Sequence, residues 1–347
     1  MFLWWYPRHL LLPLEKIIFW ASLPLLFLLL PVALLWQMIS FLRKQLQLIL
    51  YRSSPTKLPI LLVGNIVVGG GGKTSVVAML CRYFPRAVVL VKNYKTSWRG
   101  KGDAILLEKN KKNHFLMDEA ILHSQYSDVV LCKNRRAGLT LIEKLRAKKK
   151  YNIIIADDGF EDYSFRPTLT LLTLQADFYL GNGWLLPLGP LRQFLSVALN
   201  NQHRPPAGLL LLRDGFYETP SLPNIKQPVF ILKKNYHPPF VTGQKLYGFA
   251  AIARPDSFFT AIKKHHGHLV GYKKFSDHHY FSKQQLHKLT HLAQHHRAKL
   301  ITTKKDFVRL PPDIAKQVLM MPQTIVAEPK LIAFLKSKLY NMGYGKK

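Results

Sequence analysis

The segment LLVGNIVVGGGGKTS, residues 61–75, constrains the fold more than any other part of this chain. It places four consecutive glycines and a Lys-Thr pair directly after a short apolar run. Glycine allows backbone conformations that other residues avoid, so that successive N–H groups can turn inward and bind phosphate oxygens. The apolar periodicity that follows predicts a helix, whose N-terminal dipole would face the same anion. We therefore expect a strand, a phosphate-binding loop and a helix, in this order.

This loop matches the pattern GxxxxGK[ST] except at its first position, where Val67 replaces glycine. Lys73 would place a positive charge at the outer phosphates, and Thr74 would place a hydroxyl at Mg²⁺. A flexible turn between strand and helix is the alternative, but the strand context and the Lys-Thr pair favour nucleotide binding, with ATP and Mg²⁺ as ligands. The expected nucleotide-binding residues are Val67, Val68, Gly69, Gly70, Gly71, Gly72, Lys73 and Thr74.

The segment YNIIIADDG, residues 151–159, is an apolar strand that ends in two carboxylates, Asp157 and Asp158. Phosphate-loop enzymes hold Mg²⁺ with a carboxylate from such a strand end. An acidic pair at this place could also form a turn or cap a helix. Because the chain also contains a phosphate loop, the sequence favours the metal and catalytic roles.

The N-terminal region contains a run, residues 17–42, without any charged residue. As a helix it would be about 39 Å long, whereas a bilayer core is about 30 Å thick. Trp4, Trp5 and Trp36 lie near its ends, as is typical of interfacial aromatic residues. We expect a membrane helix here; a buried core helix and a shallow insertion in the membrane plane are the alternatives.

The net charge of +31 indicates attraction to polyanions. More basic residues follow the apolar run than precede it, which places the main body in the cytoplasm by the positive-inside rule. Anionic lipid headgroups are the expected partners of this charge. No interleaved stripe of aromatic and basic residues stands out, so nucleic acid is not expected as a partner. The two cysteines, Cys81 and Cys132, lack metal-ligand spacing and fit a reducing compartment.

Apolar runs alternate with helical patterns after the apolar N-terminal run, which predicts a mostly parallel α/β sheet. Pro-rich sequence around residues 204–208 and 219–228 interrupts this rhythm, and a second, smaller α/β unit is expected from residue 245. The predicted division is 1–45 as the membrane anchor helix, 46–244 as the phosphate-loop domain and 245–347 as the smaller domain. Strands are expected at 60–63, 87–91, 128–131, 153–156, 169–174, 246–250, 269–275 and 300–303, with amphipathic helices at 256–266 and 283–296.

Three further segments carry polar or unusual residues. LMDEA (116–120) and FSDHHY (275–280) are weak signals in isolation, because Asp-Glu often begins a helix and histidine-rich loops often lie at the surface. LGNGWLLPLGPLR (180–192) combines glycines and prolines with apolar residues around Trp184. Such a loop suits contact with a lipid or a domain interface, or it is a packed structural loop.

Together these segments resemble one family, the tetraacyldisaccharide 4'-kinases of lipid A biosynthesis. The resemblance covers nearly the whole chain, with its motifs in the right order, and the GNG…LLP.GPLR segment is especially specific. The segments that resemble the family are VGNIVVGGGGKT (63–74), MDEA (117–120), KNRR (133–136), ADDGF (156–160), GNGWLLPLGPLR (181–192), FAAIARPDSFF (249–259), DHH (277–279) and TTKKD (302–306).

The resemblance implies an enzyme that transfers the ATP γ-phosphate to the 4'-hydroxyl of a tetraacylated glucosamine disaccharide 1-phosphate, an acylated phospholipid, at the cytoplasmic face of the bacterial inner membrane. It implies a phosphate-loop domain and a smaller domain that close around the site. By implication Lys73, Thr74 and Asp157 bind nucleotide and metal, and Lys73 and Asp158 serve catalysis. An Asp–His dyad corresponds to Asp118 and His278. The positions implied for substrate binding are Arg192, Asn182, Glu119 and Arg135, with Arg136 as the alternative to Arg135.

Several positions depart from the family pattern. VKNYK (91–95) replaces SRGYG, Glu161 and Asp162 replace Gln-His after DDGF, Gln193 replaces an acidic residue and Lys304 replaces Glu. Because the phosphate loop, the acidic pair and the Asp–His candidates remain, we expect an active enzyme. The alternative is a membrane-tethered phosphate-loop ATPase or nucleotide switch with a protein partner, which would not need the GPLR loop or His278.

Overall fold

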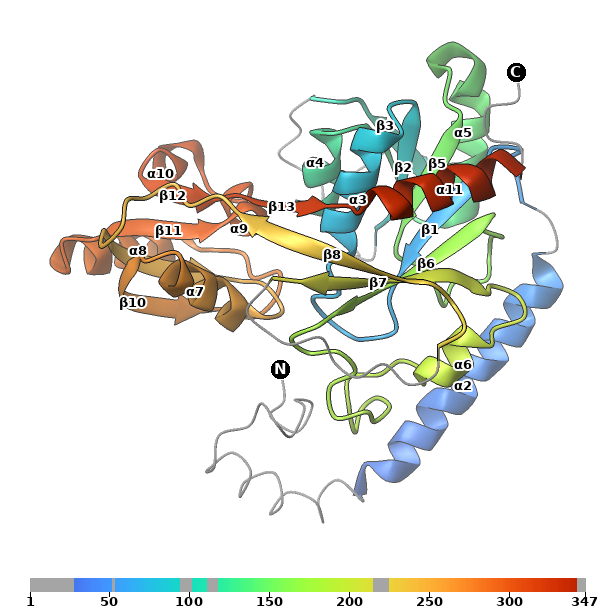
Figure 1. Ribbon diagram of the computed structural model, residues 1–347, viewed down its shortest axis with the longest axis horizontal. Coiled ribbons are helices and arrows are strands. Elements are labelled where there is room, and N and C mark those ends of the chain that lie inside the picture. Colours follow the sequence, from blue (N-terminus) through green and yellow to red (C-terminus); the bar gives the residue numbers. More distant parts are fainter. Residues whose placement is uncertain (1–27, 52–53, 94–101, 111–117, 215–224, 342–347) are drawn as a thin grey trace. The chain divides into compact units, whose positions relative to one another are not determined.

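The computed structural model describes residues 28–51, 54–93, 102–110, 118–214 and 225–341 (Figure 1). The chain divides into two compact units. The first consists of Met1–Lys233 and Val326–Lys347, and the second of Lys234–Ile325. Each unit is an α/β structure with its own sheet, so the predicted α/β class holds for both.

The first sheet has nine strands in the order β13-β8-β7-β6-β1-β5-β2-β4-β3. The pairs β1–β5, β1–β6, β2–β5, β2–β4, β6–β7 and β7–β8 are parallel, whereas β3 pairs with β4 in the antiparallel direction. The sheet is therefore mostly parallel. Its strands are β1 (Ile60–Gly64), β2 (Ala87–Lys92), β3 (Ala104–Leu107), β4 (Asp128–Cys132), β5 (Ile153–Asp157), β6 (Leu169–Gln175), β7 (Pro206–Arg213), β8 (Val229–Tyr236) and β13 (Gln323–Val326).

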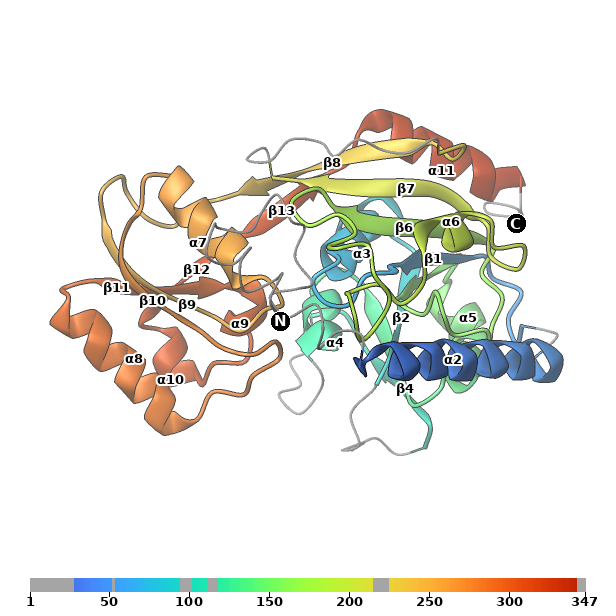
Figure 2. The same ribbon diagram turned by 90° about the horizontal axis from the view of Figure 1, so that it is seen from below.

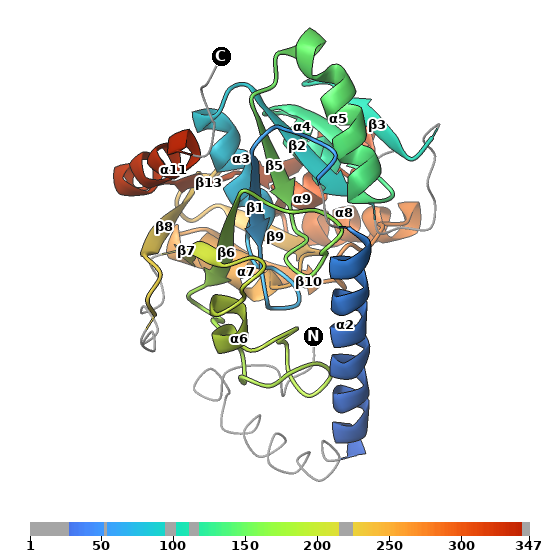
Figure 3. The ribbon, with the colours of Figure 1, turned by 90° about the vertical axis from the view of Figure 1, so that its right-hand side faces the viewer.

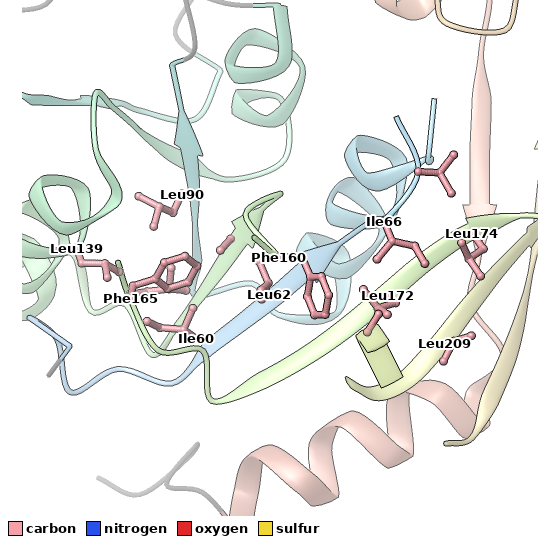
Figure 4. Close-up of a cluster of buried hydrophobic side chains, with 14 of the residues drawn as sticks. Ile60, Leu62, Ile66, Leu90, Leu139, Phe160, Phe165, Leu172, Leu174 and Leu209 are labelled. Atoms are coloured by element: carbon pink, nitrogen blue, oxygen red, sulfur yellow. The ribbon is translucent and has the colours of Figure 1, made fainter. Parts of the chain in front are cut away.

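The central strands are apolar because helices cover both of their faces. Every residue of β1 and of β5 is buried. Ile60 and Leu62 of β1 point into the same core as Phe160 and Leu172 (Figure 4). Continuous apolar runs are the expected signature of such strands, which is why the sequence located them well.

Helices α5 (Arg135–Lys149) and α6 (Leu195–Leu199) cover this core and contribute apolar residues to it. Helix α3 (Lys73–Tyr83) lies on the opposite face together with α11 (Pro329–Asn341) (Figure 3). The ring of Phe334 on α11 lies 5.3 Å from that of Phe230 on β8. The short helix α4 (Asp118–Ser124) packs beside α3.

All eight strands that the sequence predicts are present, within one or two residues of the predicted limits, as are both amphipathic helices of the second unit. The Pro-rich sequence at 204–208 differs from expectation, because β7 begins inside it at Pro206. Proline is tolerated as the first residue of a strand, and the leucine run that follows is buried in the sheet. The composition of the stretch thus concealed a core strand.

The predicted smaller domain extended from residue 245 to the end of the chain, but the second unit spans Lys234–Ile325. The C-terminal residues return to the first unit because α11 buries Leu331, Leu335 and Leu339 there. Short apolar segments after residue 318 gave no signal about which unit they would join.

The predicted membrane-spanning helix is not supported by the structure. Among the residues that the structure describes, no helix is long and apolar enough to cross a membrane. Helix α2 (Leu30–Leu50) contains Arg43, Lys44 and several glutamines, which interrupt its apolar character. It lies along the outside of the first unit (Figure 2). The earlier part of the apolar run, up to residue 27, lies outside the described residues.

The second unit contains a four-stranded sheet in the order β10-β9-β11-β12, with all pairs parallel. Helix α8 begins with a capping box, in which Ser282 and Gln285 bond to each other's backbone N–H. The elements are β9 (Lys245–Ala250), α7 (Pro255–Lys264), β10 (His268–Lys274), α8 (Lys283–His295), β11 (Lys299–Thr303), α9 (Lys304–Phe307), α10 (Pro312–Ala315) and β12 (Val318–Met321).

Candidate active site

The phosphate loop connects the carboxyl end of β1 to the first turn of α3, as the sequence predicted. Gly69, Gly70 and Gly72 have positive φ angles of 77°, 34° and 76°. Gly72 is the residue that caps α3, and a Cβ atom on it would lie only 2.3 Å from Leu212. Both the backbone angle and the lack of space therefore require glycine at this position.

Val67 stands where the pattern has its first glycine, and the structure accounts for the difference. It is buried in the core and forms a β-bridge with Leu191. The backbone N–H of Val68 donates to the carbonyl of Pro190 at 2.8 Å, and that of Arg192 donates to the carbonyl of Ile66 at 2.8 Å. The loop thus begins in an extended, paired conformation that a β-branched residue adopts readily.

These contacts place the GPLR segment against the phosphate loop. Asn182 shapes this segment, since its side chain donates to the carbonyl of Leu188 and accepts from the N–H of Trp184, each at 3.0 Å. The side chain of Trp184 is 50% exposed. Arg192 is the last residue of this segment and lies 3.8 Å from carboxylate oxygens of both Asp158 and Glu161. A cation is therefore held at the edge of the phosphate loop.

The two carboxylates after β5 have different environments. Asp157 is 4% exposed, and its Oδ2 atom lies 2.7 Å from Nε2 of the buried His123. Asp158 has φ 61° and lies 3.4 Å from the Nζ atom of Lys73. Burial alone would raise the pKa of Asp158, but the charges of Lys73, Arg192 and Arg135 outweigh it and hold the pKa far below its usual range. Asp158 is therefore ionised at neutral pH.

The Oδ1 atom of Asp157 is buried and has no hydrogen-bond partner among the described residues. A buried carboxylate oxygen without a donor is costly unless something binds it. Mg²⁺ prefers such oxygens and is usually held by one or two carboxylates together with substrate phosphates. The described residues contain no cluster of three or more acidic, histidine or cysteine side chains able to hold a metal by themselves. The Oδ1 atom of Asp157 is thus an oxygen of the chemical kind that Mg²⁺ prefers.

Two buried arginines organise the loop that follows the acidic pair. Arg204, on the segment before β7, donates to the carbonyls of Gly159, Phe160, Asp162 and Phe165. Arg135 is fully buried, and its Nη1 atom lies 2.6 Å from Asp162. Its substrate-binding role was implied by the resemblance; the structure places its guanidinium inside the protein, against this loop. Arg136 donates to the carbonyl of Ser164 at 3.5 Å.

Two of the departures from the family pattern meet in this cluster. Lys92, within the VKNYK segment, lies 3.4 Å from Asp162, which stands where the family has histidine. Glu161, which stands where the family has glutamine, lies beside Arg192, next to Gln193. The changed residues thus pair with one another or with neighbouring cations of the site.

The other predicted site residues lie on two different units. Asp118 and Glu119 begin α4 in the first unit; the side chain of Asp118 is outside the described part of the structure, and Glu119 is half-buried. His278 belongs to the second unit, has φ 59°, and its Nε2 atom lies 3.1 Å from the Nζ atom of Lys305. Lys305 also lies 3.4 Å from Asp277. The DHH and TTKKD motifs therefore come together within the second unit.

The sequence did not single out His123, Arg204 or Gln175 as site residues. Gln175 ends β6, and its side-chain amide donates to the carbonyl of Gly70 in the phosphate loop. A weak signal existed for Gln175, since the carboxyl ends of parallel strands meet at one edge of the sheet. For the isolated His123 and Arg204 there was none.

A strand, a glycine-rich loop, a helix and an adjacent acidic strand end define a phosphate-loop nucleotide-binding protein of the α/β class. A family model described as LpxK, tetraacyldisaccharide-1-P 4'-kinase, matches residues 25–340. The chain belongs to this family, and the resemblance found in the sequence is confirmed.

Individual relatives agree. The tetraacyldisaccharide 4'-kinase of Rickettsia felis is 29% identical over 339 residues, which cover 93% of this chain and 98% of that protein. The enzyme of the same name from Rickettsia peacockii is 30% identical over 304 residues, with 84% and 88% covered. The crystal structure of an "apo" form of LpxK from Aquifex aeolicus in complex with ATP shares the fold, with a TM-score of 0.69, 21% identity, and 92% of this chain and 100% of that chain covered.

Proposed function

We propose that this chain is a lipid A disaccharide 4'-kinase, which transfers the γ-phosphate of ATP to the 4'-hydroxyl of a tetraacylated glucosamine disaccharide 1-phosphate. The observation that carries the proposal is the joining of the GPLR segment to the phosphate loop, which sets Lys73 and Arg192 around one carboxylate, Asp158. Phosphoryl transfer depends mainly on positioning and on charge stabilisation, and two cations at one loop edge supply both.

In this proposal the residues after β1 bind the nucleotide. The N–H groups of the glycine loop and of the first turn of α3 surround its phosphates, and Lys73 neutralises the charge that develops at the outer one. Thr74 and the free Oδ1 atom of Asp157 would hold Mg²⁺, which would supply positive charge to the phosphates. Asp158 keeps Lys73 and Arg192 in place until the phosphates arrive.

The acceptor hydroxyl needs a base, because a sugar hydroxyl is a poor nucleophile at neutral pH. We assign this role to Asp118, with His278 supporting it, as the family resemblance implies. Lys305 would donate to Nε2 of His278 and fix the orientation of the ring. Arg192, Asn182 and Glu119 would line the acceptor side, Asn182 by shaping the GPLR segment.

Membrane association is proposed through the surface of α2. Leu34, Leu35, Ile39 and Phe41 are each 51–63% exposed, although α2 also bonds to the first unit through Gln37 and Gln47. Apolar side chains in this number are rarely left in water, and an acylated substrate has to be reached in a membrane. We propose that the main body lies at the cytoplasmic face of the bacterial inner membrane, where anionic lipids attract its positive charge.

The deciding experiment incubates the purified chain with γ-labelled ATP, Mg²⁺ and the tetraacyl disaccharide 1-phosphate in mixed micelles. We expect a labelled product with a second phosphate at the 4' position, identified by mass spectrometry. Release of labelled inorganic phosphate without a labelled lipid would contradict the proposal and would favour the ATPase or nucleotide-switch alternative.

A further inference from the structure

His123 is a buried partner of Asp157, and the proposed function does not explain its role. It lies in the last turn of α4, and its side chain is fully buried. Its Nε2 atom lies 2.7 Å from Oδ2 of Asp157, at the carboxyl end of β5. The ring nitrogen on the other side, Nδ1, has no hydrogen-bond partner among the described residues. In the described part of the chain, the imidazole ring thus makes its side-chain hydrogen bond with Asp157.

The direction of this hydrogen bond follows from chemistry. A carboxylate oxygen carries no proton and can only accept, so the hydrogen must be on Nε2 of His123. The bond occupies Oδ2 and leaves Oδ1 as the only buried oxygen of Asp157 without a donor in the described part of the chain. The two oxygens of one carboxylate are therefore made unequal by a single histidine.

This inequality has a consequence for metal binding. The last torsion of an aspartate side chain is broad, so an unrestrained carboxylate presents either oxygen over a wide range of angles. Mg²⁺ requires nearly ideal octahedral geometry and tolerates little variation in its ligands. A hydrogen-bond donor to one carboxylate oxygen fixes the plane of the carboxylate and therefore the position of its second oxygen.

We propose that His123 is a positioning residue: it holds Oδ2 of Asp157 so that Oδ1 is presented in a fixed orientation to the divalent cation that accompanies the nucleotide. This inference rests on the proposed function, in which Asp157 and Thr74 hold Mg²⁺. Partners that orient metal ligands typically contribute about 10–100-fold to metal affinity. His123 itself touches neither the substrate nor the metal.

The rival interpretation is that the His123–Asp157 pair only stabilises the packing of α4 on the sheet. Both interpretations predict a loss of stability when the pair is broken, because an unpartnered buried carboxylate is costly. The two interpretations differ in the effect they predict on Mg²⁺ binding. A packing role would leave the Mg²⁺ dependence of nucleotide binding unchanged in any variant that still folds.

The test compares His123→Leu with His123→Gln. Leucine fills a similar volume without a donor, whereas the amide nitrogen of glutamine can reach the position of Nε2 and donate. Binding of a non-hydrolysable ATP analogue to the full chain is measured by calorimetry over a series of Mg²⁺ concentrations and also in EDTA. No acceptor lipid is needed, so the readout is independent of phosphoryl transfer.

For His123→Leu we expect the Mg²⁺ concentration at half-maximal nucleotide binding to rise about 10–100-fold. Binding in EDTA should stay unchanged, and His123→Gln should return most of the Mg²⁺ affinity. Leu139→Ala is the matched control, because it removes a fully buried side chain on the opposite face of the sheet. It should destabilise the protein without altering the Mg²⁺ dependence.

An unchanged Mg²⁺ dependence in folded His123→Leu would overturn the inference and leave the proposed function intact. If that variant does not fold, His123→Gln decides: wild-type Mg²⁺ affinity supports the role of the donor, whereas a loss equal to that of Asp157→Asn contradicts it. If the wild-type chain binds nucleotide equally well with and without Mg²⁺, the metal role of Asp157 fails, and the inference fails with it.

Discussion

The Nζ atom of Lys73 lies 3.4 Å from Oδ2 of Asp158, so the cation expected at the outer phosphates is paired with the carboxylate that directly follows the neighbouring strand β5. The side chains of this pair are 18% and 19% exposed, which leaves it accessible from one side. An arriving phosphate would compete with Asp158 for the ammonium group. Asp158 therefore keeps Lys73 extended toward the loop before the nucleotide binds.

We expect Lys73→Ala to lower the rate of phosphoryl transfer by about 10²–10³-fold, because a preorganised donor to the developing charge is lost. The melting temperature should change little, since Lys73 is not part of the core. Labelled ATP and circular dichroism would measure both properties. Lys148→Ala, a change at an exposed lysine of α5, serves as the control and should leave transfer unaltered. Near-normal turnover of Lys73→Ala would remove the nucleotide assignment.

Asp162 should contribute to stability rather than to chemistry. Burial would raise the pKa of its carboxyl group, but the Arg135 guanidinium, the Ser164 hydroxyl and the Lys92 ammonium outweigh burial and lower the pKa well below the usual range. We expect Asp162→Asn to reduce the free energy of unfolding by roughly 3–5 kcal/mol at neutral pH, because the buried Arg135 is left without its carboxylate. Urea unfolding would measure this difference.

The pH dependence of this contribution has a definite sign. Because the pKa of Asp162 is lower in the folded state, its stabilisation is complete above the unfolded value of about 3.9 and is lost as the pH falls toward the folded value. The difference between wild type and Asp162→Asn should thus be constant above about pH 5 and shrink below about pH 4. Asp103→Asn removes an exposed carboxylate paired with Lys133 and should change stability by less than about 1 kcal/mol. A pH-independent difference for Asp162 would refute this account.

The fold could be predicted from the sequence wherever one physical signal dominated. Buried parallel strands such as β5 are continuous apolar runs. The loop before Lys73 requires glycine, and the sequence shows these glycines directly. Strand β7 was hidden because the Pro-rich composition around it outweighed its leucine run. The predicted membrane helix rested on the absence of charge in residues 17–42, and α2, the described part of that region, continues with polar residues to Leu50. The part of the run before residue 28 lies outside the described residues.

The site was less predictable because its supporting contacts join single residues that are distant in the sequence. Arg204 donates hydrogen bonds to a loop about 40 residues before it, and the sequence around Arg204 does not predict these bonds. The Lys92–Asp162 pair unites two positions that, taken separately, were only departures from a family pattern. Such pairs have no periodicity, so only the folded chain shows that they compensate each other.

The exposed side of α2 should determine binding to bilayers. We expect the triple variant Leu35→Gln, Ile39→Gln, Leu42→Gln to bind phosphatidylglycerol vesicles at least about tenfold more weakly, since each half-exposed side chain contributes on the order of 1 kcal/mol when buried in lipid. Thermal stability should stay unchanged. Flotation of vesicles would measure binding. Val241→Gln, at a residue 72% exposed in the second unit, is the control. Equal binding of the triple variant would mean that α2 does not contact the lipid.

The last prediction concerns the proposed dyad of Asp118 and His278. These residues are about 160 positions apart and belong to different units. A positioned base contributes roughly 10²–10⁴ to the rate of such a transfer. We therefore expect Asp118→Asn and His278→Ala each to lower kcat by about 10²-fold or more, with little change in the affinity for ATP. Steady-state kinetics with the disaccharide lipid and calorimetry with an ATP analogue would separate the two effects.

If the two residues act as one unit, the double variant Asp118→Asn/His278→Ala should lose much less than the product of the single losses, because removing either member already disables the other. His279→Ala is the matched control, since its ring stacks on Phe275 and bonds to Gln285 within the second unit. It should leave kcat within a few-fold of the wild-type value. Losses that multiply independently, or a silent His278→Ala, would exclude the dyad. Asp158 would then be the next candidate for the base, and His279 would be one as well if its own variant lost activity.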